Sequence, residues 1–293
     1  MTAARLGRGD GDRLFLVVVA ALFVVSVTAT IVMCVSMSLS PSTTAMDPMP
    51  MSMPMPGGWT MSALWRPMCG QTWAGVAASF IGMWTVMTMA MMLPSLTPML
   101  WRYRRALTQS AAASRIIGPR RIDSLVALAG AGYFAVWIAL GGVVFAAGVA
   151  LTALAMRHAA LSRGVPFAAG IVVLAAGALQ FSRWKARRLA CCRHASDRAP
   201  PASVSAGPSV ASADARSAWR HGVRLGLHCC DCCAGFTAIL LVSGVMDWRV
   251  MAAVTLAISA ERLLPRGERI AWASGVVAVG VGVLSVAQAA GLG

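Results

Sequence analysis

Long runs of apolar residues, separated by short polar and charged segments, dominate the pattern of the chain. The first run, residues 14–35, has 22 residues and no charged side chain. At about 1.5 Å per residue, a helix of that length crosses the ~30 Å hydrocarbon core of a bilayer. The pattern therefore predicts an all-α protein, a polytopic bundle of transmembrane helices. Further runs of this kind cover residues 73–99, 124–156, 165–182 and 270–290.

Residues 225–264 form another, longer apolar segment with one polar break at Asp247-Trp248-Arg249. We expect it to fold as a tight helical hairpin of two short spans, which brings the predicted total to about seven. The run at 14–35 resembles a secretory signal peptide in position only. Its apolar region is too long, and Met33 to Ser36 is a poor cleavage site because small residues are missing.

The distribution of basic residues predicts the orientation in the membrane. The chain has 25 Lys and Arg against 10 Asp and Glu, a net charge of +15. With seven spans and the N-terminus in the cytoplasm, all but four of the basic residues fall on the cytoplasmic side, as the positive-inside rule requires. This predicts a multi-pass protein of the bacterial inner membrane with its C-terminus outside, and it explains the basic charge without nucleic acid. The four outer residues are Arg66, Arg157, Arg163 and Arg249.

These spans divide the chain into six predicted segments. Within the cytoplasmic loop, residues 195–218 are rich in Ala, Ser and Pro, and we expect a flexible linker there. Glycines in the later spans predict close helix packing. The segments are a cytoplasmic tail at 1–13, a first helix at 14–35, an external Met/Pro-rich loop at 36–72, helices two to four at 73–182, a basic cytoplasmic loop at 183–224 and helices five to seven at 225–293.

Methionine is concentrated in and after the external loop, where 13 of the 19 Met lie between Met46 and Met99. In the loop, Met alternates with proline, which keeps the chain extended. A thioether is a neutral, soft ligand that suits Cu(I) and survives in an oxidising compartment. The loop therefore predicts a site that captures Cu(I), with a Pro-rich spacer as the alternative. Its candidate ligands are Met49, Met51, Met53 and Met55.

A methionine stripe continues into the second predicted helix. Met83, Met87 and Met91 are spaced four residues apart and share one helix face, with Met92 beside them. Such a stripe can relay a soft ion through the bilayer, but helix packing explains the same spacing, because Met fills irregular gaps. Met87 and Met91 are thus candidate ligands with both interpretations open. We expect Pro94 and Pro98 to break or kink this helix near its cytoplasmic end.

Cysteines give the strongest chemical signal, because four of the eight lie in the sequence HCCDCC at 228–233. On a helix, Cys229, Cys232 and Cys233 share a face, and histidines form an adjoining stripe. Thiols on the cytoplasmic side stay reduced, and with imidazoles they form sites for Cu(I) or Zn(II). Packing of small buried thiols is the alternative. The candidate ligands are Cys192, Cys229, Cys232, Cys233, His221 and His228.

Other functional classes fit less well. The two Cys-x-x-Cys pairs also match a dithiol redox motif, but in membrane enzymes that serve secreted proteins such pairs lie on the outer face. Phosphate loops, G-x-S-x-G and dinucleotide fingerprints are missing from the sequence, so we expect binding rather than catalysis. A non-catalytic accessory or assembly subunit of a membrane metalloenzyme or respiratory complex remains a third interpretation.

Four ordered motifs resemble the bacterial domain-of-unknown-function family 2182, described as predicted metal-binding integral membrane proteins. The resemblance covers roughly residues 80–265 and implies metal binding without an established activity. One position departs from it, since Arg188 stands where the family has its first Cys, and Cys191 or His194 can substitute. The motifs are Trp84 and Met87 with Ala90 to Ser95, Pro98 and Met99; Gln180 to Ser182 with Lys185, Cys192 and Arg193; His221 and Gly222 with Gly226, Cys229, Cys232 and Cys233; and Gly244 to Met246 with Met251 to Ala253 and Glu261 to Leu263.

The sequence as a whole predicts an inner-membrane protein that binds a soft metal ion for copper handling or transport. Cu(I) is the expected ion and Zn(II) the second choice. The expected partners are the lipid bilayer and the metal ion, with a metallochaperone or a membrane complex as a further candidate and no nucleic acid.

Overall fold

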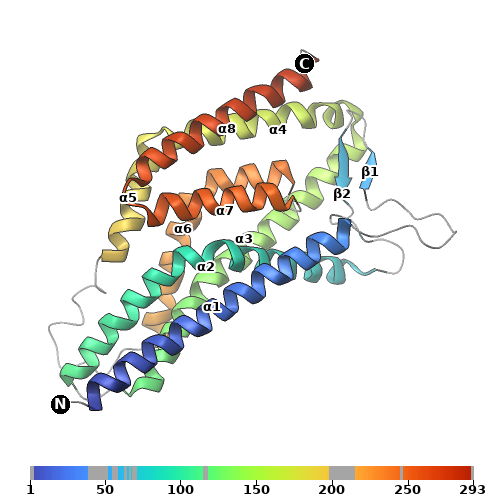
Figure 1. Ribbon diagram of the computed structural model, residues 1–293. Coiled ribbons are helices and arrows are strands. Elements are labelled where there is room, and N and C mark those ends of the chain that lie inside the picture. The colour runs from blue at the N-terminus through green and yellow to red at the C-terminus, as the bar shows by residue number, and fades with distance from the viewer. Residues whose placement is uncertain are drawn as a thin grey trace.

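A computed structural model describes residues 3–38, 52–54, 59–62, 65, 67, 71–114, 118–197, 215–244 and 247–291 (Figure 1). Over these ranges the chain is helical, as predicted, apart from two three-residue strands that pair antiparallel, with Met53 opposite Met61. The elements are α1 (Ala3–Ser38), β1 (Ser52–Pro54), β2 (Thr60–Ser62), α2 (Trp73–Ser114), α3 (Pro119–Arg157), α4 (Ala159–Gln180), α5 (Arg183–Asp197), α6 (Ala215–Ser243), α7 (Trp248–Leu263) and α8 (Gly267–Ala289).

Six of the described helices are long and apolar enough to cross a membrane: α1, α2, α3, α4, α6 and α8. The predicted hairpin at 225–264 exists, but its two arms are unequal. Helix α6 begins at Ala215, whereas α7 has only 16 residues, about 24 Å of helix, which is less than the ~30 Å hydrocarbon core. By length and composition, α7 is thus the one predicted span that falls short among the described residues, and the number of crossings remains a prediction.

The start of α7 has a local cause at its first turn. The carboxylate of Asp247 accepts hydrogen bonds from the backbone N–H groups of Arg249, at 2.8 Å, and Val250, at 3.4 Å. This is an N-cap, which fixes where the helix begins. The polar break in the sequence is thus the cap itself.

Helix α5 lies in the segment that the sequence predicts as a cytoplasmic loop. The polar composition of α5 explains why the apolar pattern of the sequence does not predict it. Leu189 and Lys185 are nevertheless buried and hold the helix against the bundle. Most of the predicted flexible linker, residues 198–214, lies outside the described residues.

Small residues determine the closest helix contacts. A Cβ atom on Gly222 of α6 would lie 1.9 Å from the backbone oxygen of Ala129 in α3, and one on Gly282 of α8 would lie 2.8 Å from the backbone nitrogen of Leu174 in α4. The prediction of close packing is confirmed at these crossings. It is wrong for Gly142 and Gly280, which have nothing within 4 Å.

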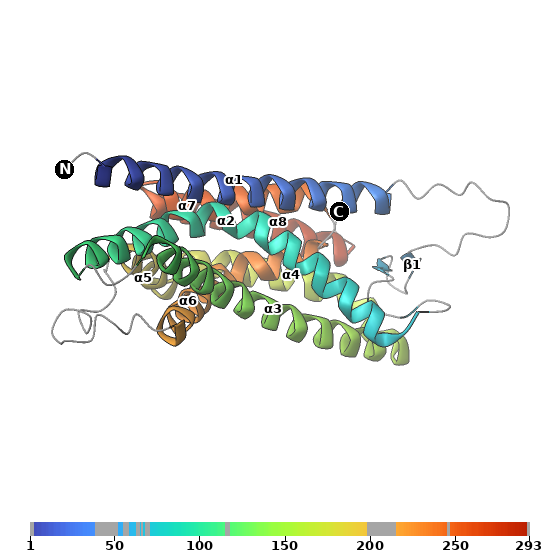
Figure 2. The same cartoon turned by 90° about the horizontal axis from the view of Figure 1, so that it is seen from below.

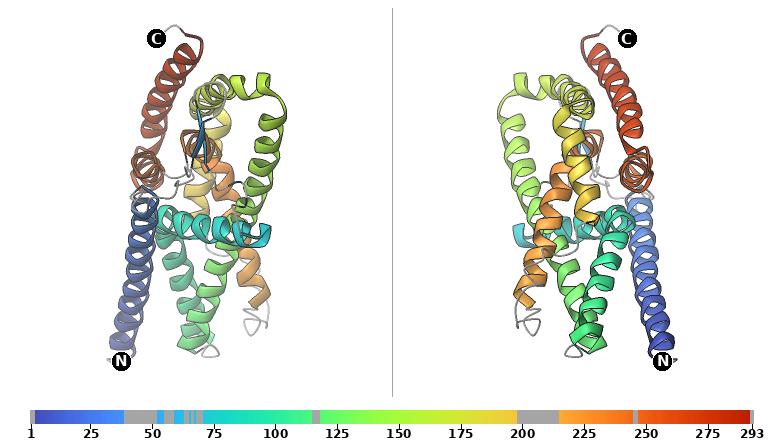
Figure 3. Two further views of the ribbon diagram at one scale, coloured as in Figure 1. Left: turned by 90° about the vertical axis from the view of Figure 1, so that its right-hand side faces the viewer. Right: turned by 90° about the vertical axis from the view of Figure 1, so that its left-hand side faces the viewer.

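Apart from α5, which lies across the end of α4, the helices lie roughly side by side and alternate in direction (Figures 1 and 2). Helix α1 starts at the end of the bundle where α2 finishes, and its own end lies at the side where the β1–β2 pair sits. Figure 3 shows α1 at the edge of the bundle, where it packs mainly on α2. The alternation agrees with the predicted arrangement, while the side that faces the cytoplasm remains a prediction.

Helix α2 continues through Pro94 and Pro98 to Ser114, so the prolines do not end it. The helix changes direction along its length (Figure 2), as expected where prolines remove backbone donors. The side chain of Ser95 donates to the backbone oxygen of Met92 at 3.0 Å, beside Pro94. This irregular part of α2 faces the cysteines of α6.

Candidate metal centre

Two thiols and a thioether meet in the core of the bundle. Cys229 and Cys233 lie one turn apart on α6, each 2% exposed, and their thiols hydrogen-bond to each other. The Cys229 Sγ atom lies 3.8 Å from the Sδ atom of Met92 on α2, which is 1% exposed. Tyr133 of α3 donates its hydroxyl to Cys229 Sγ at 2.8 Å. Residues i and i+4 share a helix face, so α6 presents both thiols to α2.

A cationic side chain from α7 completes this group. The guanidinium of Arg262 donates from Nη2 to Cys233 Sγ at 3.3 Å and to the backbone oxygen of Cys229 at 3.4 Å. Its Nη1 atom lies 3.4 Å from the hydroxyl of Ser95. A guanidinium next to a thiol stabilises the thiolate, and the thiolate is the form that binds metals.

A buried ion pair lies next to the thiols. Lys185 of α5 pairs with Glu261 of α7 at 3.0 Å and also donates to the backbone oxygen of Cys232 at 2.8 Å. The second carboxylate oxygen of Glu261 accepts from Ser274 of α8 at 3.0 Å. Four helices are therefore joined by polar groups at this point, and the charge of Glu261 is compensated by Lys185.

The remaining cysteines of the motif occupy other surroundings. Cys232 is buried against Leu189 of α5, in a cluster separate from the one that holds Cys229 and Cys233. Cys230 is only partly buried beside the main core. The backbone of Cys192 belongs to α5, but its side chain lies outside the described part of the structure. The expected face of three thiols is thus divided between two clusters.

The contacts described for His221 and His228 do not link either ring to the thiols of Cys229 and Cys233. The ring of His221 stacks on Tyr103 of α2, with centroids 4.7 Å apart. His228 directly precedes Cys229 and is partly buried on α6. The ligand roles predicted for both residues remain predictions.

The structure describes the candidate methionines of α2 but only one of those in the loop. Met87 and Met91 are buried in the same apolar cluster as Cys229 and Cys233, so the stripe lies in the core that contains the thiols. Met53 is described only as part of β1. Three loop candidates, Met49, Met51 and Met55, lie outside the described residues.

The donor set fits a soft ion of low coordination number. Two thiols and a thioether are the ligands that Cu(I) prefers, whereas a structural Zn(II) site needs four N, S or O ligands. Among the described residues, no group of three or more His, Cys, Asp and Glu side chains could hold a metal ion. Cys229, Cys233 and Met92 are therefore the candidate donors for a soft ion such as Cu(I).

Sequence reasoning missed four residues that surround the thiols: Tyr133, Arg262, Ser95 and Glu261. The last three lie in the motifs of the resemblance, yet no residue among them has a spacing that signals a ligand. The sequence did offer one signal for these residues: two consecutive charged residues, Glu261 and Arg262, end an apolar segment. Charged residues inside membrane proteins are functional more often than elsewhere.

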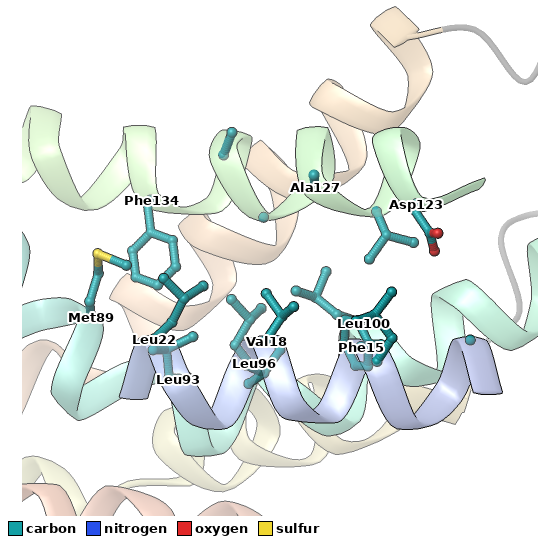
Figure 4. A pocket seen from close by; sticks show the side chains of 16 residues that line it. Phe15, Val18, Leu22, Met89, Leu93, Leu96, Leu100, Asp123, Ala127 and Phe134 are labelled. Atoms are coloured by element: carbon teal, nitrogen blue, oxygen red, sulfur yellow. The ribbon is translucent and has the colours of Figure 1, made fainter. Parts of the chain in front are cut away.

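An apolar groove between α1, α2 and α3 has a volume of about 380 Å³ but a different chemistry (Figure 4). Its labelled side chains include Phe15, Leu22, Leu96 and Phe134, and its only sulfur atom belongs to Met89. A single thioether in an aliphatic groove does not make a metal site, so the candidate centre is the thiol group on the α6 side of α2.

Comparison with known proteins identifies a family for this chain. No curated protein and no solved structure matches the chain, whereas residues 81–285 match the family model PpoB2, described as a copper chaperone. The matched range contains Met92, Cys229, Cys233 and Arg262, and it leaves out α1 and the β1–β2 pair. The predicted resemblance was to family 2182 of metal-binding membrane proteins; the match supports a copper-related bacterial family and does not carry that name. The chain belongs to the PpoB2 copper chaperone family.

Proposed function

We propose that this membrane protein is a copper chaperone that holds Cu(I) between Cys229, Cys233 and Met92. The observation that carries the proposal is the contact of Cys229 Sγ with Met92 Sδ at 3.8 Å, with Cys233 hydrogen-bonded alongside. Three soft donors from two helices meet in a buried position. The family and the six apolar helices support copper handling in a membrane.

A site with only three donors suits a carrier. A chaperone has to release its ion to a partner, and a low coordination number leaves a position open for an incoming ligand. Two of the donors are thiolates, which exchange metal through shared intermediates with other thiols. The expected recipient is a metallochaperone or a metalloenzyme of the membrane.

The methionines are proposed as the route to this site. Met83, Met87 and Met91 are buried in the cluster that contains the thiols, which supports a relay along α2. The loop methionines Met49, Met51, Met53 and Met55 would capture the ion at the outer surface. Transport across the inner membrane, with the N-terminus inside, belongs to the proposal at this finer level.

The cytoplasmic exit is proposed to use the second thiol cluster. Cys232 packs against Leu189 of α5, and Cys192 follows Leu189 by three residues in the same helix. These two thiols would receive the ion after Cys229 and Cys233. His221 and His228 are the further candidate ligands near this end of α6.

Copper titration of the full chain tests the core site. The purified protein, reduced and anaerobic in detergent, is titrated with Cu(I) against a chromophoric chelator. Replacing both Cys229 and Cys233 by Ser should remove about one equivalent, because Ser is not a soft donor. The matched control is Cys230→Ser, which should bind like the parent.

The copper titration, together with a redox titration of the thiols, distinguishes the alternative functions. A protein that acts as a thiol oxidoreductase would show a reversible two-electron couple and no loss of metal in the double variant. Unchanged copper content in the double variant would remove Cys229 and Cys233 from the site.

A further inference from the structure

We infer that Arg262 is a specificity-determining residue that makes the thiol site select a monovalent soft cation over a divalent one. The inference deepens the proposed function and rests on it. Its starting point is geometric: the guanidinium lies 3.3 Å from Cys233 Sγ and 3.4 Å from the backbone oxygen of Cys229. It thus borders the space between the two proposed ligands.

The positive charge of Arg262 has no carboxylate partner within the described residues. Its neighbour Glu261 is paired with Lys185. Asp231 of α6 is half-buried and paired with Arg188 at 3.1 Å. The remaining side chains around the thiols, from α2 and α3, are neutral: Met92, Ser95 and Tyr133.

Formal charges then decide which ion leaves the site neutral. Two thiolates with Cu(I) form an anionic unit, and the guanidinium balances it, so the complete site carries no net charge. The same thiolates with a divalent ion form a neutral unit, and Arg262 leaves an uncompensated positive charge. A net charge here is costly, because both thiols are buried, the guanidinium is partly buried and little solvent is available to stabilise it. The monovalent ion is therefore favoured beyond the softness of its ligands.

Substitution of Arg262 tests this selectivity directly. We would measure the affinities of the full-length protein for Ag(I), a redox-stable monovalent probe, and for Co(II), a divalent probe with visible thiolate bands. In Arg262→Gln the ratio of Ag(I) to Co(II) affinity should fall on the order of tenfold or more. Arg262→Lys keeps the charge and should keep the ratio. Arg269→Gln removes the same charge from an exposed position of α8 and is the matched control.

A second variant tests the charge without removing the arginine. Ser95 lies 3.4 Å from the Nη1 atom of Arg262, so Ser95→Asp should neutralise the guanidinium in place, and Ser95→Asn is its uncharged control. The aspartate variant should lower the same ratio and the asparagine variant should not. If Arg262→Gln does not fold, the comparison of Ser95→Asp with Ser95→Asn tests the inference in its place.

The outcomes separate this inference from the proposed function. A parent protein that binds neither Ag(I) nor Cu(I) overturns both. A parent that binds Cu(I), with an affinity ratio that stays the same in Arg262→Gln and in Ser95→Asp, overturns the selectivity inference alone. Equal losses of both ions would show Arg262 to be structural and would also overturn it.

Discussion

Met92 is the residue through which α2 touches the thiols, and its replacement gives the sharpest test at the scale of single residues. Met92→Leu keeps the volume and apolarity of the side chain but removes the sulfur. We expect Cu(I) affinity to fall about tenfold, as is usual when a ligand or its support is lost, while the fold loses less than about 1.5 kcal/mol. Competition titration and thermal unfolding in detergent measure the two effects.

Met89→Leu is the matched control for Met92→Leu. It makes the same exchange three residues away, in the groove between α1 and α3. Copper affinity should stay at the parental value in this variant. Equal affinities for both variants would exclude the thioether of Met92 as a ligand.

Single residues also show where sequence reasoning reaches its limit. The density of cysteines in HCCDCC was sufficient to propose the thiols as ligands. Their companions were not identifiable, because Arg262 and Tyr133 are separated from their cysteines by 29 and 96 residues. Contacts over such distances come from how the helices cross, and helical periodicity does not contain that information.

At the scale of elements, a substitution of Gly222 tests the close contact between α3 and α6. Gly222→Ala places a methyl group 1.9 Å from the backbone oxygen of Ala129, so α3 and α6 must separate. We expect a loss of about 3 kcal/mol or more in stability and weaker copper binding, because α6 carries both thiols. Gly142→Ala, which meets nothing within 4 Å, should be neutral or slightly stabilising. Equal unfolding temperatures would contradict the crossing.

The buried ion pair gives a second test of the elements. Lys185→Met leaves Glu261 charged and buried without its partner, and we expect a loss of about 3–5 kcal/mol. Adding Glu261→Gln to this variant should recover much of that loss, since no buried charge then remains. Arg188→Ala breaks the exposed pair with Asp231 and should cost at most about 1 kcal/mol. Unfolding midpoints of the four proteins provide the comparison, and additive losses would argue against the pairing.

Element boundaries were predictable where apolar runs were continuous. The run at 270–290 became α8, Gly267–Ala289, with little change. Helix α5 was missed because its mean composition is polar and basic, and the stabilising contacts of Leu189 and Lys185 come from other helices. The strands β1 and β2 were missed because three-residue strands are too short for alternation to be visible.

For the whole molecule, reporter fusions test the orientation. Fusions after Gly118 and after Ala206 should report the cytoplasm, and fusions after Gly57 and at Gly293 should report the outside, because basic residues remain on the cytoplasmic side. An external signal after Ala206 would overturn the arrangement. A protein in which α7 does not cross would still report the outside at Gly57 but would give a cytoplasmic signal at Gly293.

At this scale the sequence predicted the class of protein, a helical membrane bundle, because apolar length is a property of the chain alone. The number of crossings remains a prediction, because six of the described helices are long enough to span and α7 has only 16 residues. The copper assignment came from sulfur chemistry and agrees with the family.

The neighbouring residues Glu261 and Arg262 have a mechanical consequence for α7. Consecutive residues project about 100° apart around a helix axis, and here the carboxylate is held by Lys185 and Ser274 while the guanidinium is held by Cys233 and Ser95. Two such attachments on different sides prevent the helix from turning about its axis. An ion that reaches the proposed site would therefore meet a guanidinium whose direction is already set, and a motion that opens the thiols would have to come from α2 or α6.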